Sequence, residues 1–253
     1  MYNEIINTIK SALTEYAEEN KHRNWWKEPL IEIIPADDEK IISLKKIVSS
    51  DHLLPHDILP EAQSIISFFI PYHEDIVKSN IDGTMASQQW AAAYIGTNEL
   101  IKHISDTIEK LMERNGYKTG KIPATHNFNA KTLMSNWSHR HVAYIAGLGT
   151  FGINNMLITK NGCCGRFGSI IISCKLEEYR EINALKEKCL HKLNGSCGIC
   201  QKKCVVNAYE NNFNRFTCYT QCLKNGELHR ALGLADVCGK CLVGLPCSTT
   251  EPR

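Results

Sequence analysis

The sequence lacks any uninterrupted apolar stretch of about 18 residues, so it predicts no membrane-spanning helix. Its N-terminus carries Glu4 and Lys10 among the apolar residues and therefore lacks the continuous apolar core of a signal peptide. Internal repeats and low-complexity segments are also missing. Because nothing marks the chain as secreted, we expect it in the reducing cytoplasm, where its 12 cysteines would not form disulfides.

Acidic residues are missing from one long segment. The 63 residues from Arg114 to Leu176 contain no Asp or Glu, although they include eight Lys or Arg residues in a chain of net charge +2. Such a segment keeps negative charge away from an anionic ligand, such as a nucleotide-like cofactor tail, an anionic substrate or an RNA backbone. A buried stretch with a solvated basic rim would give the same pattern.

The 253 residues are 43% hydrophobic and 22% charged, which is typical of a globular protein with one large domain or two smaller ones. Apolar residues recur at helical spacing in residues 5–16 and 100–112, and the second helix is expected to end at Asn115–Gly116. Four segments predict strands, namely residues 30–34, 64–70, 156–159 and 169–173. A turn at residues 160–162 separates the last two. This alternation predicts an α/β or α+β domain over residues 1–180.

Nine of the 12 cysteines lie in the last 65 residues. They include two Cys-x2-Cys pairs, each with further cysteines nearby, which is typical of iron–sulfur clusters. In bacterial two-cluster ferredoxins the last cysteine of each group ligates the cluster of the other group. This exchange predicts one 4Fe–4S cluster on Cys189, Cys197, Cys200 and Cys247, and a second on Cys204, Cys218, Cys238 and Cys241.

Two departures from the ferredoxin pattern keep alternatives open. Val205 follows Cys204 where ferredoxins usually have proline, and Asn194 stands three residues before Cys197, so Cys189 must reach in from further away. Cys222 is a spare thiol that could replace Cys189 or Cys218. Zinc also binds Cys-x2-Cys pairs, normally as two pairs of ligands, and would make this segment part of a nucleic-acid-binding protein.

Two glycine-rich turns precede the last two predicted strands. Residues 147–152 have Gly-x-Gly-x-x-Gly spacing, but they follow a helix and precede a strand, which is the reverse of the dinucleotide-binding order. They therefore predict a tight turn against which a flat or bulky ligand could lie. The second turn, residues 162–169, contains Arg166, which could pair with a carboxylate or phosphate. Its adjacent Cys163 and Cys164 are expected to be packed thiols.

Taken in order, these motifs resemble the cobalamin-dependent iron–sulfur reductases, a family that includes the tRNA epoxyqueuosine reductases and, more distantly, the reductive dehalogenases. The resemblance covers roughly residues 60–253. Its motifs before the cysteine-rich tail are Ser64–Tyr72, Trp90–Tyr94, Ala146–Gly152, Leu157–Thr159 and Gly162.

The resemblance implies a nitroreductase-like α/β scaffold over residues 1–180 that binds a corrinoid (cobalamin). A ferredoxin-like module with two 4Fe–4S clusters would follow over residues 181–253. An external low-potential donor of the ferredoxin or flavodoxin type would supply electrons for reduction of a modified tRNA base or a small anionic substrate. The residues expected to border the corrinoid are Tyr94, Gly147, Leu148, Gly149, Gly152, Arg166, Gly168 and Ser169.

The sequence departs from the epoxyqueuosine reductases at the proton donor, because their aspartate before the Gly-Leu-Gly turn has no counterpart in this acid-free segment. The titratable groups expected to replace it are His139, His141 and Tyr144, with His126 as a further candidate. The helical-repeat extension of many epoxyqueuosine reductases does not follow the cysteines. Both departures favour a divergent substrate. The alternative is an electron-transfer or corrinoid-activating protein without its own substrate.

Overall fold

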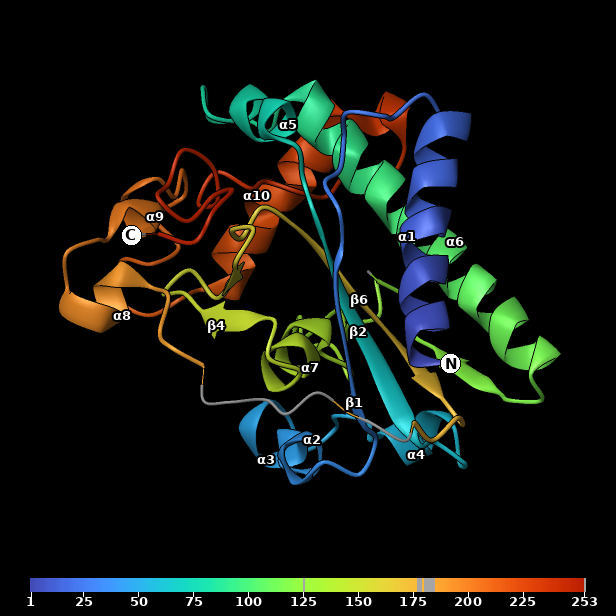
Figure 1. Cartoon of the computed structure of the whole chain (residues 1–253). Helices are drawn as coiled ribbons and strands as arrows, with labels where there is room; N and C mark the ends of the chain where they lie inside the picture. The colour runs from blue at the N-terminus through green and yellow to red at the C-terminus, as the bar shows by residue number, and fades with distance from the viewer. Residues whose placement is uncertain (125, 177–178, 180–184, 253) are drawn as a thin grey trace.

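The computed structural model describes residues 1–124, 126–176, 179 and 185–252. Its centre is a four-stranded antiparallel sheet in the order β1-β2-β6-β3 (Figure 1). The strands are β1 (Leu30–Pro35), β2 (Ser64–Pro71), β3 (Thr119–Lys121) and β6 (Gly165–Ile172). Because every pairing is antiparallel, the mixed helix and sheet architecture is α+β.

Two long helices, α1 (Tyr2–Glu19) and α6 (Gln88–Arg114), pack together on one face of this sheet (Figure 1). Ser87 caps α6, because its hydroxyl accepts a hydrogen bond of 3.1 Å from the backbone N–H of Trp90. The helix ends before Asn115–Gly116, which confirms the predicted stop. Gly116 has φ +77°, a conformation that glycine adopts without the steric cost of a side chain.

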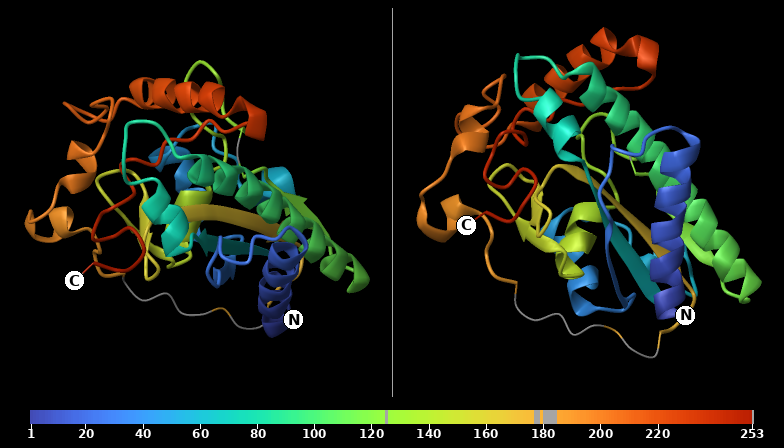
Figure 2. Two further views of the ribbon diagram at one scale, coloured as in Figure 1. Left: turned by 90° about the horizontal axis from the view of Figure 1, so that it is seen from above. Right: turned by 45° about the horizontal axis from the view of Figure 1, so that its top comes forward.

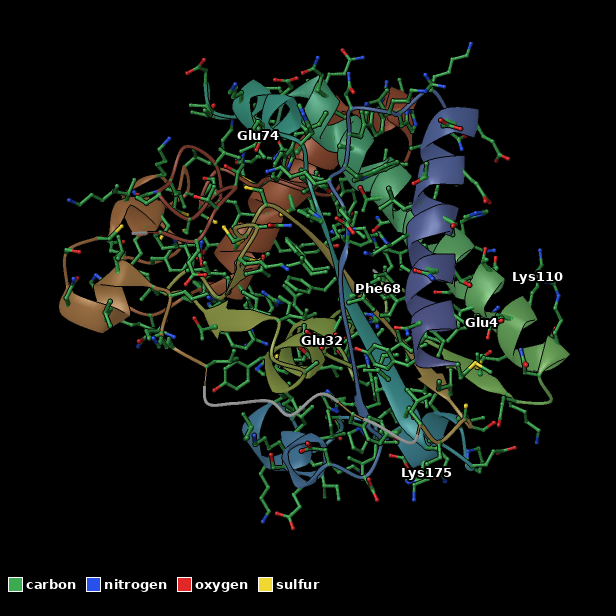
Figure 3. The ribbon with its side chains drawn as sticks, viewed as in Figure 1. Glu4, Glu32, Phe68, Glu74, Lys110 and Lys175 are labelled. Carbon is green, nitrogen blue, oxygen red and sulfur yellow. The ribbon has the colours of Figure 1, made fainter. Side chains whose placement is uncertain are left out.

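Strand β2 lies in the interior of the sheet, and all eight of its residues are buried, as its apolar run predicted. Successive side chains of a strand face opposite sides. Phe68, marked in Figure 3, therefore packs with α1 and α6, whereas its neighbours Ile65 and Phe69 pack on the opposite side. That opposite side is covered in part by α7 (His139–Ile145).

A second, two-stranded sheet pairs β4 (Gly149–Phe151) with β5 (Leu157–Thr159). The sequence predicted β5 and β6 as two strands around one turn. Both strands form, but β5 pairs with β4, and β6 pairs with β2 and β3. Short helices complete this part of the chain: α2 (Glu39–Ile42), α3 (Leu44–Ile47), α4 (Pro55–Ile58) and α5 (Glu74–Ser79).

The cysteine-rich segment contains α8 (Leu190–Asn194), α9 (Ile199–Lys202), α10 (Arg215–Leu228) and the short helix η1 (Arg230–Leu232). The predicted domain boundary at 180/181 lies outside the described residues. Helix α10 runs beside the start of α6 (Figure 2), where the Asn225 side chain accepts a hydrogen bond from the Ala86 N–H at 2.9 Å. In the described part of the chain, no helix is long and apolar enough to cross a lipid bilayer.

Candidate functional site

The eight cysteines predicted as cluster ligands gather into two sets in the structure. The first cysteine set lines a cavity of about 370 Å³ and comprises Cys189, Cys197, Cys200 and Cys247. The second cysteine set lines a separate cavity of about 1310 Å³, called the large cavity, and comprises Cys204, Cys218, Cys238 and Cys241. The tertiary structure thus exchanges Cys204 and Cys247 between the two groups of the sequence.

Each cysteine set combines residues from distant segments. In the first set, Cys189 precedes α8 and Cys200 lies within α9, whereas Cys247 comes from the C-terminal loop. In the second set, Cys218 lies on α10 and Cys238 follows it in a loop. Four thiols on one cavity wall form the donor set that a 4Fe–4S cluster takes. In the described ranges, no three His, Cys, Asp or Glu side chains are grouped to hold a single metal ion.

Burial and neighbouring thiols disfavour the thiolate forms of Cys200 and Cys241. Burial raises the pKa of Cys200 to about 11, and neighbouring cysteines add smaller effects, of which that of Cys247 is the largest. Burial, followed in size by the electrostatic effect of Cys218, raises the pKa of Cys241 to about 12. These thiols are protonated at neutral pH, so a metal cluster that binds them must displace their protons.

Cys222 belongs with the second cysteine set. It lies one helical turn after Cys218 on α10, and both thiols line the large cavity. The Cys222 thiol also interacts with that of Cys218 and lies near Cys238. Cys222 can therefore compete with Cys218 for a cluster at this position, whereas Cys189 lines the other cavity.

Asn154 links the two cysteine sets. Its side chain lines both cavities and donates a hydrogen bond of 3.0 Å to the backbone carbonyl of Cys241. The Asn154 carbonyl in turn accepts a hydrogen bond of 3.0 Å from the hydroxyl of Tyr209. With only 4% of its surface exposed, Asn154 is a fixed bridge between the cavities.

Asp236 and Tyr94 of the large-cavity wall, together with His126 outside that lining, form a polar group that we call the Asp236 cluster. The Asp236 carboxylate accepts a hydrogen bond of 3.1 Å from the hydroxyl of Tyr94. Both of its oxygens also lie 3.1–3.2 Å from Nε2 of His126. The guanidinium carbon of Arg166 lies 4.4 Å above the centre of the Tyr94 ring, in a cation–π contact.

Two buried hydrogen-bond donors beside the large cavity have no partner among the described residues, namely Nε of Arg166 and Nε1 of Trp90. The Nη2 atom of Arg166 is satisfied by the carbonyl of Ala124 at 3.2 Å. Buried donors are rarely left unpaired, so two of them on one cavity wall fit a ligand with acceptor atoms.

His139 lies in a side cavity of about 750 Å³, which shares Arg140 and Arg166 with the large cavity. Ser169 accepts a hydrogen bond of 2.9 Å from Nε1 of Trp137, so its hydroxyl can donate to Nδ1 of His139 at 2.7 Å. The Nε2–H of His139 then donates to the Pro123 carbonyl at 3.1 Å. Burial lowers the pKa of His139 to about 4, so the ring is neutral at pH 7 with its one proton already committed.

The other two residues predicted as proton donors lie elsewhere. Nδ1 of His141 is 2.7 Å from the Ser138 hydroxyl, and its ring packs against Phe151 with centroids 4.8 Å apart. Burial lowers the pKa of His141 to about 4. Tyr144 is 44% exposed and also lies against Phe151. The structure therefore separates these two side chains from the Asp236 cluster.

The residues of the two glycine-rich turns lie in several different places in the structure. Gly147, with φ +82°, and Leu148 line a different cavity beside β1. A side chain at Gly149 would meet the Ile158 carbonyl oxygen at 2.2 Å, and one at Gly168 would meet the Phe68 ring at 2.4 Å.

Gly152 lines the cavity of the first cysteine set. Of the residues expected to border the corrinoid, only Tyr94 and Arg166 line the large cavity among the described residues.

The eight Lys and Arg side chains of the acid-free segment do not gather into one positively charged surface. Lys118 pairs with Glu61, and Lys121 pairs with Asp106 at 2.9 Å and with Glu109. Two other bases of this segment, Arg140 and Arg166, line the large cavity. Cys163 and Cys164 are buried, as expected of packed thiols.

No protein-family model and no curated protein matches this chain. Among solved structures, an epoxyqueuosine reductase from Bacillus subtilis, with its catalytic aspartate loop swung out of the active site, is 17% identical with a TM-score of 0.53. The match covers 97% of this chain and 70% of the other. An epoxyqueuosine reductase with an epoxyqueuosine-modified tRNA-Tyr stem loop is 16% identical, with TM-score 0.54 and coverages of 97% and 67%.

A catabolic reductive dehalogenase in complex with 3-bromo-4-hydroxybenzoic acid is 13% identical, with a TM-score of 0.55. That match covers 88% of this chain but only 30% of the dehalogenase. The resemblance first suggested by the motifs thus reappears in the structural neighbours. This chain has the fold that epoxyqueuosine reductases share with a reductive dehalogenase.

Proposed function

We propose that this chain is an iron–sulfur oxidoreductase that uses two 4Fe–4S clusters and cobalamin to reduce a substrate in the large cavity. The observation that carries the proposal is the position of the second cysteine set. Its four thiols line the same cavity as the Asp236 cluster and the two unpaired donors. The fold shared with epoxyqueuosine reductases and a reductive dehalogenase supports the same conclusion.

The chain's own residues suit the binding of a large anionic cofactor. Without the open solvent that its 1310 Å³ include, the large cavity measures about 390 Å³, which lies within the roughly 300–1,000 Å³ of a typical small-molecule pocket. Arg166 and Arg140 would bind the phosphate of the nucleotide tail, and Nε1 of Trp90 would donate to an acceptor on the ligand. When bound, cobalamin would supply a strongly reducing cobalt centre, and the clusters would supply single electrons.

The two cysteine sets have different roles in this proposal. The second set lies at the large cavity and would hold the cluster next to the cofactor. The first set would hold the cluster that receives electrons from outside, and Asn154 would fill the gap between the two.

The Asp236 cluster supplies the proton in this proposal. The His126 imidazole contacts the Asp236 carboxylate through Nε2 and can carry a proton, so we assign it the role of proton source. Asp236 accepts hydrogen bonds from both His126 and Tyr94, which holds the tyrosine hydroxyl at the cavity wall. This group replaces the missing aspartate better than His139, whose proton is committed to the Pro123 carbonyl.

The substrate that we propose is a modified tRNA base or a small anionic organic molecule. Arg140 and Arg166 provide the positive charge that either substrate needs. The alternative of an electron carrier without its own substrate leaves the unpaired donors and the Asp236 cluster unexplained.

The test is an anaerobic titration of the cluster-loaded protein with cob(II)alamin, followed by electron paramagnetic resonance. We expect a base-off cobalt signal that saturates near one cobalamin per chain. An unchanged cobalt signal, with both clusters demonstrably present, would contradict cobalamin binding and favour the electron carrier. Iron and sulfide near zero after anaerobic purification would instead favour zinc.

A further inference from the structure

Two cysteines of the first set come from α8 and α9, since Cys189 precedes α8 and Cys200 lies within α9, and these helices lie on the opposite side of the molecule from α1 (Figure 1). The cavity of this set is lined by Leu190 and His191 of α8, and Cys197 lies two residues before α9 with part of its surface exposed. A cluster held here would lie close to the surface that α8 and α9 form. Electron tunnelling slows steeply with distance, so a donor protein must bind close to this surface.

This surface is basic. From Lys188 to Tyr209 the sequence has four lysines and no acidic residue. Lys192 and Lys202 are exposed, and Lys203 is half-buried. In the described part of the chain, no carboxylate pairs with any of these three lysines; Lys192 donates only to the carbonyl of Phe151, at 2.5 Å.

The neighbouring acidic groups are already engaged. The Glu187 carboxylate accepts hydrogen bonds from the Cys189 N–H at 2.8 Å and from the Thr150 hydroxyl at 3.2 Å. Glu251 forms an ion pair of 2.6 Å with Lys188. With Lys188 paired to Glu251, the three remaining lysines outnumber the Glu187 carboxylate, so the surface keeps a net positive charge above the first cysteine set.

Two large apolar side chains lie exposed among these lysines. Leu193 on α8 is 60% exposed and Ile199 on α9 is 40% exposed. A small apolar centre within a charged rim is typical of interfaces that form and dissociate quickly, as electron-transfer complexes do. We call Lys192, Leu193, Ile199, Lys202 and Lys203 the α8–α9 surface.

We propose that the α8–α9 surface docks a small acidic redox protein that delivers single electrons to the first cysteine set. This inference rests on the proposed function, because it requires a cluster at that set. Opposite charges would guide the encounter and orient the partner, and Leu193 with Ile199 would form the dry centre of the complex.

The test measures the rate at which a reduced acidic flavodoxin reduces the oxidised clusters in anaerobic stopped-flow experiments. The variant is Lys192→Glu/Lys202→Glu, and a charge-neutral Lys192→Gln/Lys202→Gln pair supplies an intermediate step. The matched control is Lys46→Glu/Lys110→Glu, which reverses two exposed lysines on α3 and α6. Figure 3 marks Lys110 on the opposite side of the molecule from α8.

We expect the second-order rate constant of the charge-reversed variant to fall about tenfold or more at low salt, and that of the neutral pair to fall less. The control should stay within about twofold, and added salt should slow the wild-type protein. Reduction by photoreduced deazaflavin, a small molecule that needs no docking, should be the same in every variant.

Equal flavodoxin rates in the wild-type protein and the charge-reversed variant would overturn the docking proposal. So would an equal loss in the control. If the variant loses affinity for a tRNA stem loop while its flavodoxin rate is unchanged, the surface binds nucleic acid instead. Two failures of the proposed function are distinguishable from a failure of docking. Without clusters, wild-type protein would contain no iron for deazaflavin to reduce; without cobalamin binding, the clusters would still be reduced but the cobalt signal would not change.

Discussion

The chain uses the tetrapeptide Cys-Gly-x-Cys twice, and the two copies lie in different surroundings. In the first, Gly198 is extended with φ 180°, and a side chain there would come no closer to another group than 3.8 Å. In the second, Gly239 has φ +74°, and a side chain would lie 2.4 Å from the buried ring of Trp90. The same ligand spacing therefore forms an open surface loop in one place and a tightly packed wall in the other.

The residues that follow the two glycines differ in exposure in the same way. Ile199 is exposed, whereas Lys240 is only 3% exposed and donates hydrogen bonds to the carbonyls of Asn80 and Asp82 at 2.8 and 2.7 Å. The comparison teaches that spacing alone specifies a set of thiols, whereas the packing around it decides whether that set can meet a partner protein or a buried ligand.

The largest expected effect comes from removing one ligand of either set. Cys238→Ala should lower the rate at which bound cob(II)alamin is reduced by about 100-fold or more, because the second cysteine set lies at the large cavity. Cys197→Ala should abolish reduction by flavodoxin but retain much of the reduction by a small reductant. The formation rate of cob(I)alamin, followed by absorbance, measures both. Equal losses with the small reductant would remove the distinction between the sets.

Reversing one charge in the large cavity should have the next largest effect. Arg166→Glu places a carboxylate where an anionic ligand is expected, and should weaken cobalamin binding by about tenfold or more. The control is Arg114→Glu, an exposed base from the same acid-free segment. Equilibrium titration with cob(II)alamin measures the dissociation constants. Equal values for wild-type protein and Arg166→Glu would place the ligand elsewhere.

The two glycines test the comparison directly. Gly239→Ala should destabilise the protein by about 2–4 kcal/mol, because it combines a left-handed backbone with overpacking against Trp90. Gly198→Ala should change stability by less than about 1 kcal/mol, since its backbone and surroundings accept a methyl group. The midpoints of thermal unfolding measure the difference. A Gly198→Ala protein as unstable as Gly239→Ala would show that both loops are tightly packed.

The smallest expected effect concerns pH and the side cavity. The pKa of His139 is about 4 in the folded protein against 6.5 ordinarily, so the unfolded state binds the proton more tightly. The stabilisation by neutral His139 is complete above pH 6.5 and is lost as the pH falls toward 4. Between pH 7 and 5, the unfolding free energy should fall by about 2 kcal/mol more in the wild-type protein than in His139→Asn.

Urea unfolding at the two pH values measures this difference. An identical pH dependence in both proteins would mean that the buried ring is protonated in the folded state, or that it is reached by solvent.

Several features were readable in the sequence because they depend on neighbours along the chain. The apolar run of β2 predicts an interior strand, and Asn115–Gly116 marks the end of α6. The spacing of the cysteines, with the ferredoxin exchange, also predicted the two sets that the structure gathers. Whether these thiols bind clusters stays a prediction.

The Asp236 cluster could not be read in this way. Tyr94 and Asp236 are 142 residues apart, and His126 and Asp236 are 110 apart. Asp236 lies outside the segment before the Gly-Leu-Gly turn, so the position of the family's aspartate does not point to it. Its place two residues before Cys238 could have suggested a role at the site. His141 and Tyr144 are close to the turn in sequence, but α7 directs them toward Phe151.

The sequence by itself determined which residues are available for each chemistry: the thiols, the bases of the acid-free segment and the strand at the centre of the sheet. Only the tertiary structure decided that Arg166, Tyr94 and Asp236 share one wall, and that one cysteine set faces this wall while the other lies at α8 and α9. The physical reason is that local propensity and spacing act over a few residues, whereas a cavity is made by the packing of segments far apart in the chain.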